Sequence, residues 1–253
     1  MKQAFFRFYA ELNDFLPAER RMVTFVYPFS GRQTVKHLIE AAGVPHTEVD
    51  LVLVNGQSVS FSYFVEDGDR VSVFPVFEAF DITSVTRVRP QPLRRTRFVL
   101  DVHLGRLAVY FRMLGFDAKY GKDWRDEQLA RLARTEQRIL LTRDRELLKR
   151  NEVTHGYCIR ATSTRLQLIE VIDRFDLSKS IRPFTRCLLC NVPLEPASPD
   201  HVARNVPPAS RQHYDEFSRC PCCDRTYWKG SHYRRMTRLI DYVLAATCPV
   251  QRR

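Results

Sequence analysis

Three aspartates stand where a folded chain could bring carboxylates together. Asp101 follows the apolar segment 98–100, Asp144 follows a second apolar segment at 138–142, and Asp126 opens a segment with helical spacing. Short apolar segments are typical of buried strands in a parallel sheet, and ligands bind beyond the carboxyl ends of such strands. Carboxylates gathered there would suit Mg²⁺ or Mn²⁺. The alternative is that these aspartates cap the helices that follow them.

Two pairs of cysteines have the spacing of a structural zinc site. Cys187 and Cys190 form one Cys-x-x-Cys pair, and Cys220 and Cys223 form a second. Four thiolates complete a tetrahedral zinc site and leave no open position, so we expect the zinc to be structural and to order a proline-rich segment. No ligand role is assigned to the three other cysteines, Cys158 in an apolar segment, Cys222 inside the second pair and Cys248 in the tail.

Basic side chains accompany both groups of candidate ligands. Arg143 precedes the second strand-end aspartate and is placed to hold a substrate phosphate, and Arg106 lies on the helix that follows the first. Segment 227–236 combines cations with aromatic rings, a mixture typical of single-stranded nucleic-acid binding. Its candidate substrate contacts are Lys229, His232 and Arg235. The alternative is that the aromatic rings of this segment only pack it onto the rest of its domain.

The net charge is unevenly distributed along the 253 residues. Residues 1–80 carry 7 Lys and Arg against 10 Asp and Glu, whereas residues 81–253 carry 33 against 19. The basic surplus favours a polyanionic partner, with better solubility as the alternative reason for so many arginines. No apolar segment reaches the roughly 20 residues of a membrane span, and the N-terminus lacks the apolar core of a signal peptide. We therefore expect a cytoplasmic protein with reduced thiols.

The segments around the aspartates alternate between strand and helix patterns. Strands are expected at 98–101, 116–120, 138–142 and 157–159, and helices at 104–114, 126–133, 145–150 and 166–175. In the first of these helices the apolar side chains share one face, and Arg106 and Arg112 lie away from it. Such alternation predicts an α/β fold, a parallel sheet flanked by helices.

Residues 1–80 have a different order of elements. Strands are expected at 2–10, 23–27, 51–56 and 71–75, with a helix at 34–43 and an Asn-Gly turn after the third strand. This order of elements resembles an α+β ubiquitin-like β-grasp domain. Sequence segments 53–56 and 66–71 are similar to the corresponding segments of the sulfur-carrier branch of that fold. Sulfur carriers end in Gly-Gly, whereas this chain continues through 76–78. We therefore expect a binding or regulatory module, or one that merely packs on the second domain.

Residues 81–96 form a basic linker. Pro90 and Pro92 exclude a continuous helix or central strand. Five arginines in or beside it make a basic arm, namely Arg87, Arg89, Arg94, Arg95 and Arg97. The arm could contact phosphates or serve as a solvated hinge.

Several sequence motifs in residues 97–240 occur in an order that resembles that of one nuclease family. Segments 98–108, 112–117, 139–144 and 227–236 are similar to the Mut-7 C-terminal RNase family, a branch of the PIN-like nucleases whose members carry a zinc ribbon. The resemblance covers about residues 97–240, and a preceding β-grasp module is a known bacterial arrangement of this family. It implies a PIN-like core at 97–180, then a zinc ribbon and C-terminal helix at 181–253.

The resemblance also implies a catalytic site. Asp101, Asp126 and Asp144 match the acidic positions of a PIN-like site that holds Mg²⁺ or Mn²⁺. PIN sites often use a fourth acid, and no candidate stands at a strand end after Asp144. Asp123 and Glu127 remain alternatives or additions to Asp126.

These patterns together predict a metal-dependent ribonuclease that acts on RNA, single-stranded or tRNA-like. Two rivals stay open: a non-catalytic zinc-ribbon RNA-binding adaptor, and a toxin-like nuclease regulated by a protein partner of the β-grasp domain. A phosphatase of the haloacid dehalogenase type is not favoured, because segment 101–103 lacks the second aspartate of that nucleophile motif.

Overall fold

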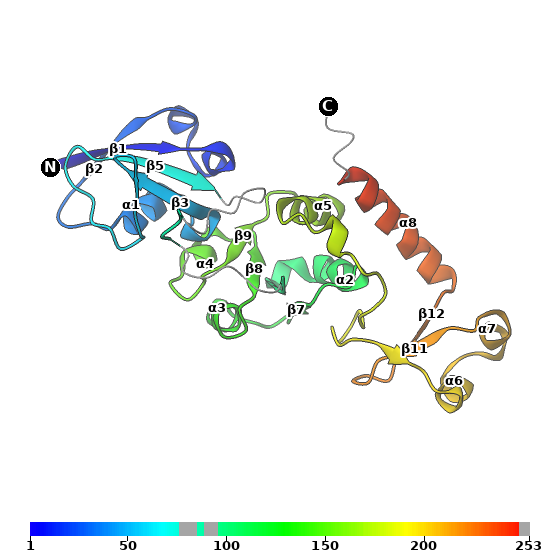
Figure 1. The fold of residues 1–253 in the computed structure, drawn as a ribbon. Coiled ribbons are helices and arrows are strands. Elements are labelled where there is room, and N and C mark those ends of the chain that lie inside the picture. Colours follow the sequence, from blue (N-terminus) through cyan, green and yellow to red (C-terminus); the bar gives the residue numbers. More distant parts are fainter. Residues whose placement is uncertain (76–84, 89–95, 248–253) are drawn as a thin grey trace. The chain divides into compact units, whose positions relative to one another are not determined.

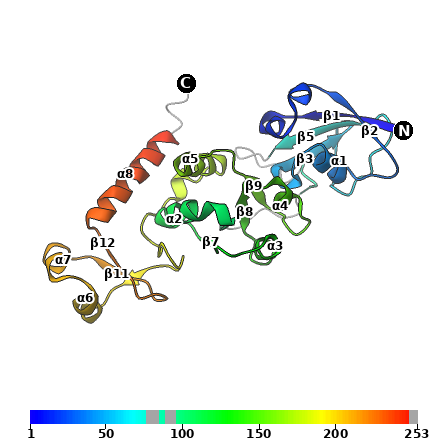
Figure 2. The same ribbon diagram turned by 180° about the vertical axis from the view of Figure 1, so that it is seen from behind.

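The computed structural model describes residues 1–75, 85–88 and 96–247, and Figures 1 and 2 show its ribbon from two opposite sides. The chain divides into two compact units, each assembled from two segments. The first unit contains Met1–Arg95 and Arg125–Cys158, and the second contains Thr96–Trp124 and Ile159–Arg253. The boundaries at 81–96 and 180 drawn from the sequence stay predictions.

The N-terminal part of the first unit has the predicted β-grasp architecture. Its strands are β1 (Lys2–Phe8), β2 (Phe25–Phe29), β3 (Val49–Val54), β4 (Gln57–Ser58) and β5 (Arg70–Pro75). They form one sheet in the order β2-β1-β5-β3-β4, in which β1 and β5 are parallel and the other neighbours antiparallel. Its helices are η1 (Ala10–Phe15), η2 (Ala18–Arg20), α1 (Val35–Ala41) and η3 (His46–Glu48).

Local sequence signals explain most of this sheet. Alternate residues of β1 are buried, as the period of a strand with one covered face requires. Thr34 caps α1 by accepting a hydrogen bond from the backbone N–H of His37. Asn55 and Gly56 both have positive φ, which allows the tight turn from β3 to β4. The strand predicted at 23–27 was wrong by two residues, because pairing with β1 matches Phe6 with Phe25 and Lys2 with Phe29.

The short helix η3 of the β-grasp part makes buried contacts with residues 125–158 of the same unit. Glu48 is 1% exposed, and its Oε1 accepts a hydrogen bond from the backbone N–H of Cys158 at 2.6 Å. The Nε2 atom of the buried His46 lies 2.9 Å from the carbonyl oxygen of Val153. The β-grasp part therefore packs on this segment within the unit.

A second sheet carries the predicted parallel strands. Its strands are β6 (Phe98–Leu100), β7 (Ala118–Tyr120), β8 (Ile139–Thr142) and β9 (Gly156–Cys158), in the order β7-β6-β8-β9. β6 pairs with β7 in parallel, and β8 pairs with β9 in parallel. Every residue of β6 and β8 is buried, as expected for strands covered on both faces. The intervening helices are η4 (Val102–Leu104), α2 (Gly105–Met113), α3 (Asp126–Thr135), α4 (Arg145–Lys149), α5 (Thr164–Arg174) and η5 (Ser178–Ser180).

The C-terminal part of the second unit is a small three-stranded sheet followed by a long helix. Its elements are β10 (Glu195–Pro196), α6 (Pro199–Asn205), α7 (Pro208–His213), β11 (Phe217–Arg219), β12 (Thr226–Trp228) and α8 (Ser231–Ala246). The strands are antiparallel in the order β10-β11-β12. Helix α8 contacts α5. Across the described residues, no helix has the length and apolar character to span a membrane.

Two features noted in the sequence, the basic arm and the cysteine of the tail, lie partly or wholly outside the described residues. Arg89, Arg94 and Arg95 of the basic arm, and Cys248, lie outside the described residues. In the described part of the linker, the hydroxyl of Thr86 donates a hydrogen bond to the backbone carbonyl of Asp50.

Candidate metal centre and nucleic-acid interface

The four predicted zinc ligands come from two turns with the same backbone pattern. In the first turn the backbone N–H of Asn191 donates to the carbonyl of Cys187, and in the second that of Asp224 donates to the carbonyl of Cys220. Asn191 and Asp224 both have positive φ, a conformation that Asn and Asp tolerate better than most residues. The residue directly after each Cys-x-x-Cys pair therefore closes the turn and lets both sulfurs face the same point.

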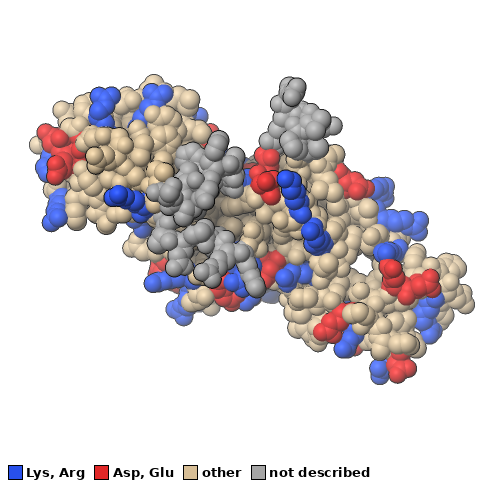
Figure 3. All heavy atoms as spheres, in the orientation of Figure 1, with Lys and Arg blue, Asp and Glu red and all other residues tan. Residues whose placement is uncertain are grey.

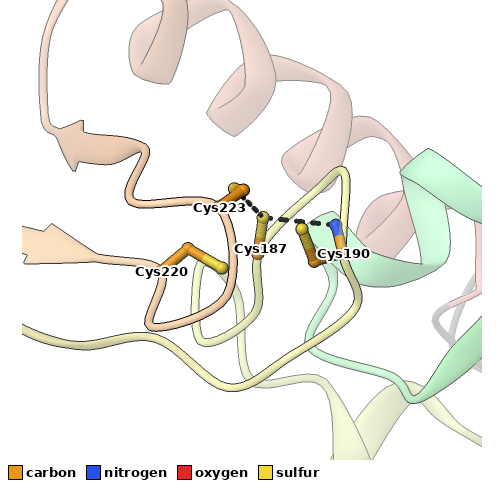
Figure 4. A group of neighbouring side chains, drawn as sticks. All are labelled: Cys187, Cys190, Cys220 and Cys223. Atoms are coloured by element: carbon orange, nitrogen blue, oxygen red, sulfur yellow. Dashed lines mark hydrogen bonds between the residues drawn. The ribbon is translucent and has the colours of Figure 1, made fainter.

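The structure brings the four sulfurs together, as Figure 4 shows. The Sγ atoms of Cys187, Cys190, Cys220 and Cys223 all lie within 4.8 Å of one another. The Sγ atoms of Cys187 and Cys223 are 3.7 Å apart. Zinc–sulfur bonds of about 2.3 Å in a tetrahedron place sulfurs roughly 3.8 Å apart, so the cluster fits zinc. Cys222 is exposed and outside the cluster, and Cys158 is buried in β9, as expected for both.

Tyr227 supports the cluster from outside the ligand set. Its phenol oxygen accepts a hydrogen bond from the backbone N–H of Leu188 at 3.2 Å and lies 3.1 Å from the Sγ of Cys187. Burial raises the pKa of Cys187, but hydrogen bonds from Tyr227 and from the backbone N–H groups of Cys190 and Leu189 outweigh it and lower that pKa to about 6. Burial, and then the neighbouring Cys187, raise the pKa of Tyr227. Tyr227 therefore stays protonated, and its hydroxyl donates a hydrogen bond to the Sγ of Cys187.

A buried arginine holds the first cysteine turn onto α2. Arg112 is 5% exposed and donates hydrogen bonds to three backbone carbonyls, those of Ala118, Leu188 and Leu189. Burial lowers the pKa of Arg112, and the nearby cysteines oppose that shift. Arg112 lies away from the apolar stripe of its helix, and it is buried all the same because the cysteine turn covers the polar side of α2 at this position.

Asn191 makes a second link from the cysteine turn to the parallel sheet. Its side-chain oxygen accepts from the backbone N–H of Ala118 at 2.9 Å, and its side-chain nitrogen donates to Asp117 Oδ1 at 2.7 Å. Sequence reasoning missed both Arg112 and Asn191. Their signal was position alone, because Asn191 follows Cys190 directly and Arg112 lies in the last turn of α2, three residues before Gly115.

The three predicted catalytic aspartates lie at the expected ends of elements. Asp101 is buried after β6, and its Oδ1 accepts a hydrogen bond from the backbone N–H of Val102. Asp144 is exposed after β8, and its Oδ1 accepts from the backbone N–H of Glu146 at 2.8 Å. Asp126 is exposed as the first residue of α3. The capping role weighed against metal binding is thus observed for Asp101 and Asp144, through one carboxylate oxygen each.

The three aspartates are divided between the two units. Within residues 1–75, 85–88 and 96–247, the cysteine cluster is the group of three or more potential ligands whose atoms lie close enough together to hold a metal ion. Asp101 belongs to the second unit, whereas Asp126 and Asp144 belong to the first. Their assembly into one metal site stays a prediction, as do Asp123 and Glu127 as alternatives.

The basic residues singled out from the sequence are all exposed. They are Arg106 on α2, Arg143 after β8, Lys229 after β12, and His232 and Arg235 on α8. Lys229 pairs with Glu216, and this exposed pair lowers the pKa of Glu216 and raises that of Lys229. On the face drawn in Figure 3, basic and acidic side chains are interspersed. Attraction for a polyanion on this face must therefore come from local groups rather than from one broad patch.

One such local group lies between α5 and α8. Arg165, Arg235, Arg238 and Tyr242 line a hollow of about 410 Å³. The last three of these residues recur at helical spacing on α8, whereas Arg165 comes from the first turn of α5. We call this group the arginine hollow. Sequence reasoning found Arg235 but missed Arg165, because the pairing of α5 with α8 is a long-range contact.

Two family models match this chain. The model described as "Mut7-C RNAse domain" matches residues 96–240, and the model described as "Mut7-C ubiquitin" matches residues 1–81. They confirm the predicted arrangement of a ubiquitin-like domain before a Mut7-C domain. No curated protein and no solved structure matches the sequence.

Proposed function

The chain belongs to the Mut7-C RNase family, and we propose that it is a ribonuclease that cleaves RNA phosphodiester bonds with the help of Mg²⁺ or Mn²⁺. The observation that carries the proposal is the match over residues 96–240, which includes the three aspartates and the four cysteines. The fold is in keeping with it, since Asp101 and Asp144 follow strands of a parallel sheet.

We assign the catalytic role to Asp101, Asp126 and Asp144. Carboxylate oxygens are the ligands that hard cations prefer, and all three aspartates stand at the ends of elements. A bound Mg²⁺ or Mn²⁺ would polarise the phosphodiester and lower the pKa of the attacking water. Arg143 and Arg106, both exposed, would hold substrate phosphates as fixed positive charges.

The zinc centre takes a structural role in this proposal. Four cysteine ligands leave no coordination position for substrate. The part of the chain that the zinc orders carries Lys229, and the following helix carries His232 and Arg235, so we assign these residues to RNA binding. A cluster of four thiolates needs a reducing compartment, and we therefore propose a cytoplasmic protein. For the ubiquitin-like domain we propose the role of binding a protein partner.

The test is cleavage of a labelled single-stranded RNA and of a folded tRNA-like RNA. Purified protein is freed of loosely bound metals and assayed with Mg²⁺, with Mn²⁺ and with neither, after its zinc content has been measured. We expect cleavage that requires an added metal. In an Asp101→Asn/Asp144→Asn variant the rate should fall by about a hundredfold or more.

An Asp200→Asn variant provides the matched control. Asp200 is an exposed aspartate in the first turn of α6, so its change has the same chemistry outside the proposed site. Its cleavage rate should equal that of the unmodified protein. Tight RNA binding without turnover in every arm would instead support the non-catalytic adaptor, and unchanged cleavage by the double variant would remove the two aspartates from the mechanism.

A further inference from the structure

A pocket of about 260 Å³ lies beside the zinc centre, wholly within the second unit. It is formed by the segment that leads into Cys187, by the β11–β12 hairpin and by the first turns of α8. Ser218 and Tyr227 pair across the hairpin, so their side chains share the face that lines the pocket. This volume is smaller than the roughly 300–1,000 Å³ of pockets for drug-sized ligands, which leaves room for one flat ring system.

Aromatic rings supply much of the pocket wall. The rings of Phe184 and Tyr233 have centroids 4.2 Å apart and planes tilted by 33°, and Tyr227 and Trp228 line the hairpin side. Flat aromatic walls bind planar groups by stacking, which contributes about 1–3 kcal/mol per base in single-stranded nucleic-acid complexes and tolerates every base. The aromatic walls therefore suit a planar nucleobase, whichever of the bases it is.

Fixed positive charge accompanies these rings. The guanidinium of Arg186 donates to the carbonyls of Gly115 and Asn191, at 3.1 and 2.8 Å, so its position is set by the backbone and its charge is not neutralised by them. Lys229 lies at the pocket with Glu216. The described residues 181–247 carry 10 Lys and Arg against 6 Asp and Glu, so the surroundings favour a ligand with negative charge beside its planar group.

We propose that this pocket receives one unstacked base of single-stranded RNA, with the adjoining phosphates next to Arg186 and Lys229. The inference rests on the proposed function for the choice of RNA as ligand. An apolar peptide is disfavoured, because it would leave the charge of Arg186 without a counter-charge.

The experiment follows binding through the fluorescence of Trp228, which lines the pocket. The chain contains two tryptophans, and a Trp124→Phe change leaves Trp228 as the remaining fluorophore. The full-length protein with this change, zinc-loaded and without added Mg²⁺ or Mn²⁺, is titrated with short single-stranded oligomers of A, of U and of C. A ribose-phosphate oligomer of the same length without bases is the matched ligand. We expect saturable quenching by all three base-bearing oligomers, and binding of the base-free oligomer that is about tenfold weaker and without quenching.

A filled pocket gives an independent readout. Ser218→Phe adds a ring inside the pocket without removing any wall, whereas Ala209→Phe adds a ring at an exposed position of α7. Ser218→Phe should weaken binding of the base-bearing oligomers about tenfold and leave binding of the base-free oligomer unchanged, and Ala209→Phe should change neither. Zinc content and circular dichroism verify that each variant is folded; the titration of the Trp124→Phe protein stands even where Ser218→Phe fails to fold.

The outcomes separate this inference from the proposed nuclease. Equal binding of base-bearing and base-free oligomers, or quenching by a phosphate-free apolar peptide but by no RNA, overturns the base pocket. Cleavage with added metal but no quenching also overturns it, while leaving the nuclease intact. Quenching without any cleavage supports the pocket and contradicts the proposed catalysis.

Discussion

The hydroxyl of Tyr227 contacts Cys187, a proposed zinc ligand, without belonging to the ligand set itself. It lies 3.1 Å from Cys187 Sγ and also accepts from the backbone N–H of Leu188, so it fixes both the charge and the geometry of the first cysteine turn. Groups that hydrogen-bond metal ligands in this way typically contribute 10–100-fold to metal affinity.

A Tyr227→Phe variant isolates that contribution, because it removes the hydroxyl and keeps the ring. We expect zinc affinity to fall by about tenfold, since the Cys187 thiolate loses a donor that lowers its pKa. Competition with a chromophoric zinc chelator measures the change. Tyr214→Phe, a half-buried ring outside the cysteine cluster, is the control. Equal affinities for the two variants would mean that the hydroxyl only orders the turn.

Arg112 and the cysteines show which residue-level features the sequence can reveal. The cysteine cluster was predictable because two Cys-x-x-Cys pairs in one chain are typical of a shared metal site. Arg112 was not, because an arginine on the polar side of an amphipathic helix has the pattern of a solvated residue. Only the fold shows that carbonyls of the cysteine turn, more than 70 positions along the chain, surround its guanidinium.

Gly115 lies between α2 and β7, where the segment that leads to the cysteine cluster approaches. It has φ +92°, and a Cβ atom there would lie 2.1 Å from the carbonyl oxygen of Arg182. The backbone N–H of Arg182 also donates to the carbonyl of Leu114. The segment leading to the first cysteine turn therefore lies directly on the end of α2, and only glycine allows that approach.

A Gly115→Ala variant should be destabilised by two separate effects, backbone strain and the clash with Arg182. Gly68→Ala supplies a control for the first alone, because Gly68 has φ +85° and no heavy atom within 4 Å of the added Cβ. We expect a loss of about 1 kcal/mol for Gly68→Ala and of about 3 kcal/mol or more for Gly115→Ala, in which the chain must shift. Urea denaturation followed by circular dichroism gives both values. Similar losses would mean that the segment moves away from α2 at little cost.

Most elements were predictable from the sequence, and their long-range pairings were not. The glycine that follows α2, the Asn-Gly turn and the Thr34 cap are local signals, and the structure contains each of them. The start of β2 was misplaced because only its register with β1 fixes where the strand begins. The aspartates follow the same division, since sequence places them at element ends but cannot establish that those ends converge.

At the scale of the molecule, the β-grasp domain is part of a larger unit. The buried carboxylate of Glu48 accepts from the backbone N–H of Cys158, which lies at the end of β9. The cation of Arg145 also lies over the ring of Phe15, with 5.0 Å between the guanidinium carbon and the ring centroid. Arg145 directly follows Asp144, so the β-grasp domain contacts the helix that a proposed catalytic residue caps.

A Glu48→Ala variant should therefore destabilise more than the β-grasp domain. Its truncation leaves the buried N–H of Cys158 without that acceptor, a loss of about 1–3 kcal/mol. We expect faster amide exchange in β9 as well as in η3, measured by hydrogen–deuterium exchange with mass spectrometry. Exposed Glu19, changed to Ala, is the control. Exchange altered in residues 1–75 alone would show that the domain contributes nothing to the stability of residues 125–158.

The arginine hollow allows electrostatic RNA binding to be tested apart from base stacking. Each phosphate neutralised on single-stranded RNA contributes roughly 0.7 to the slope of the logarithm of affinity against that of salt concentration. An Arg165→Ala/Arg238→Ala variant should therefore have a slope shallower by about 1.4, measured by fluorescence anisotropy of a labelled RNA without added Mg²⁺ or Mn²⁺. Arg131→Ala/Arg134→Ala removes the same charge from exposed positions of α3 and should leave the slope unchanged. If both pairs reduce the slope equally, net charge rather than the hollow attracts the RNA. If only the first does, the contact lies between α5 and α8, where the chain gathers three arginines around one hollow.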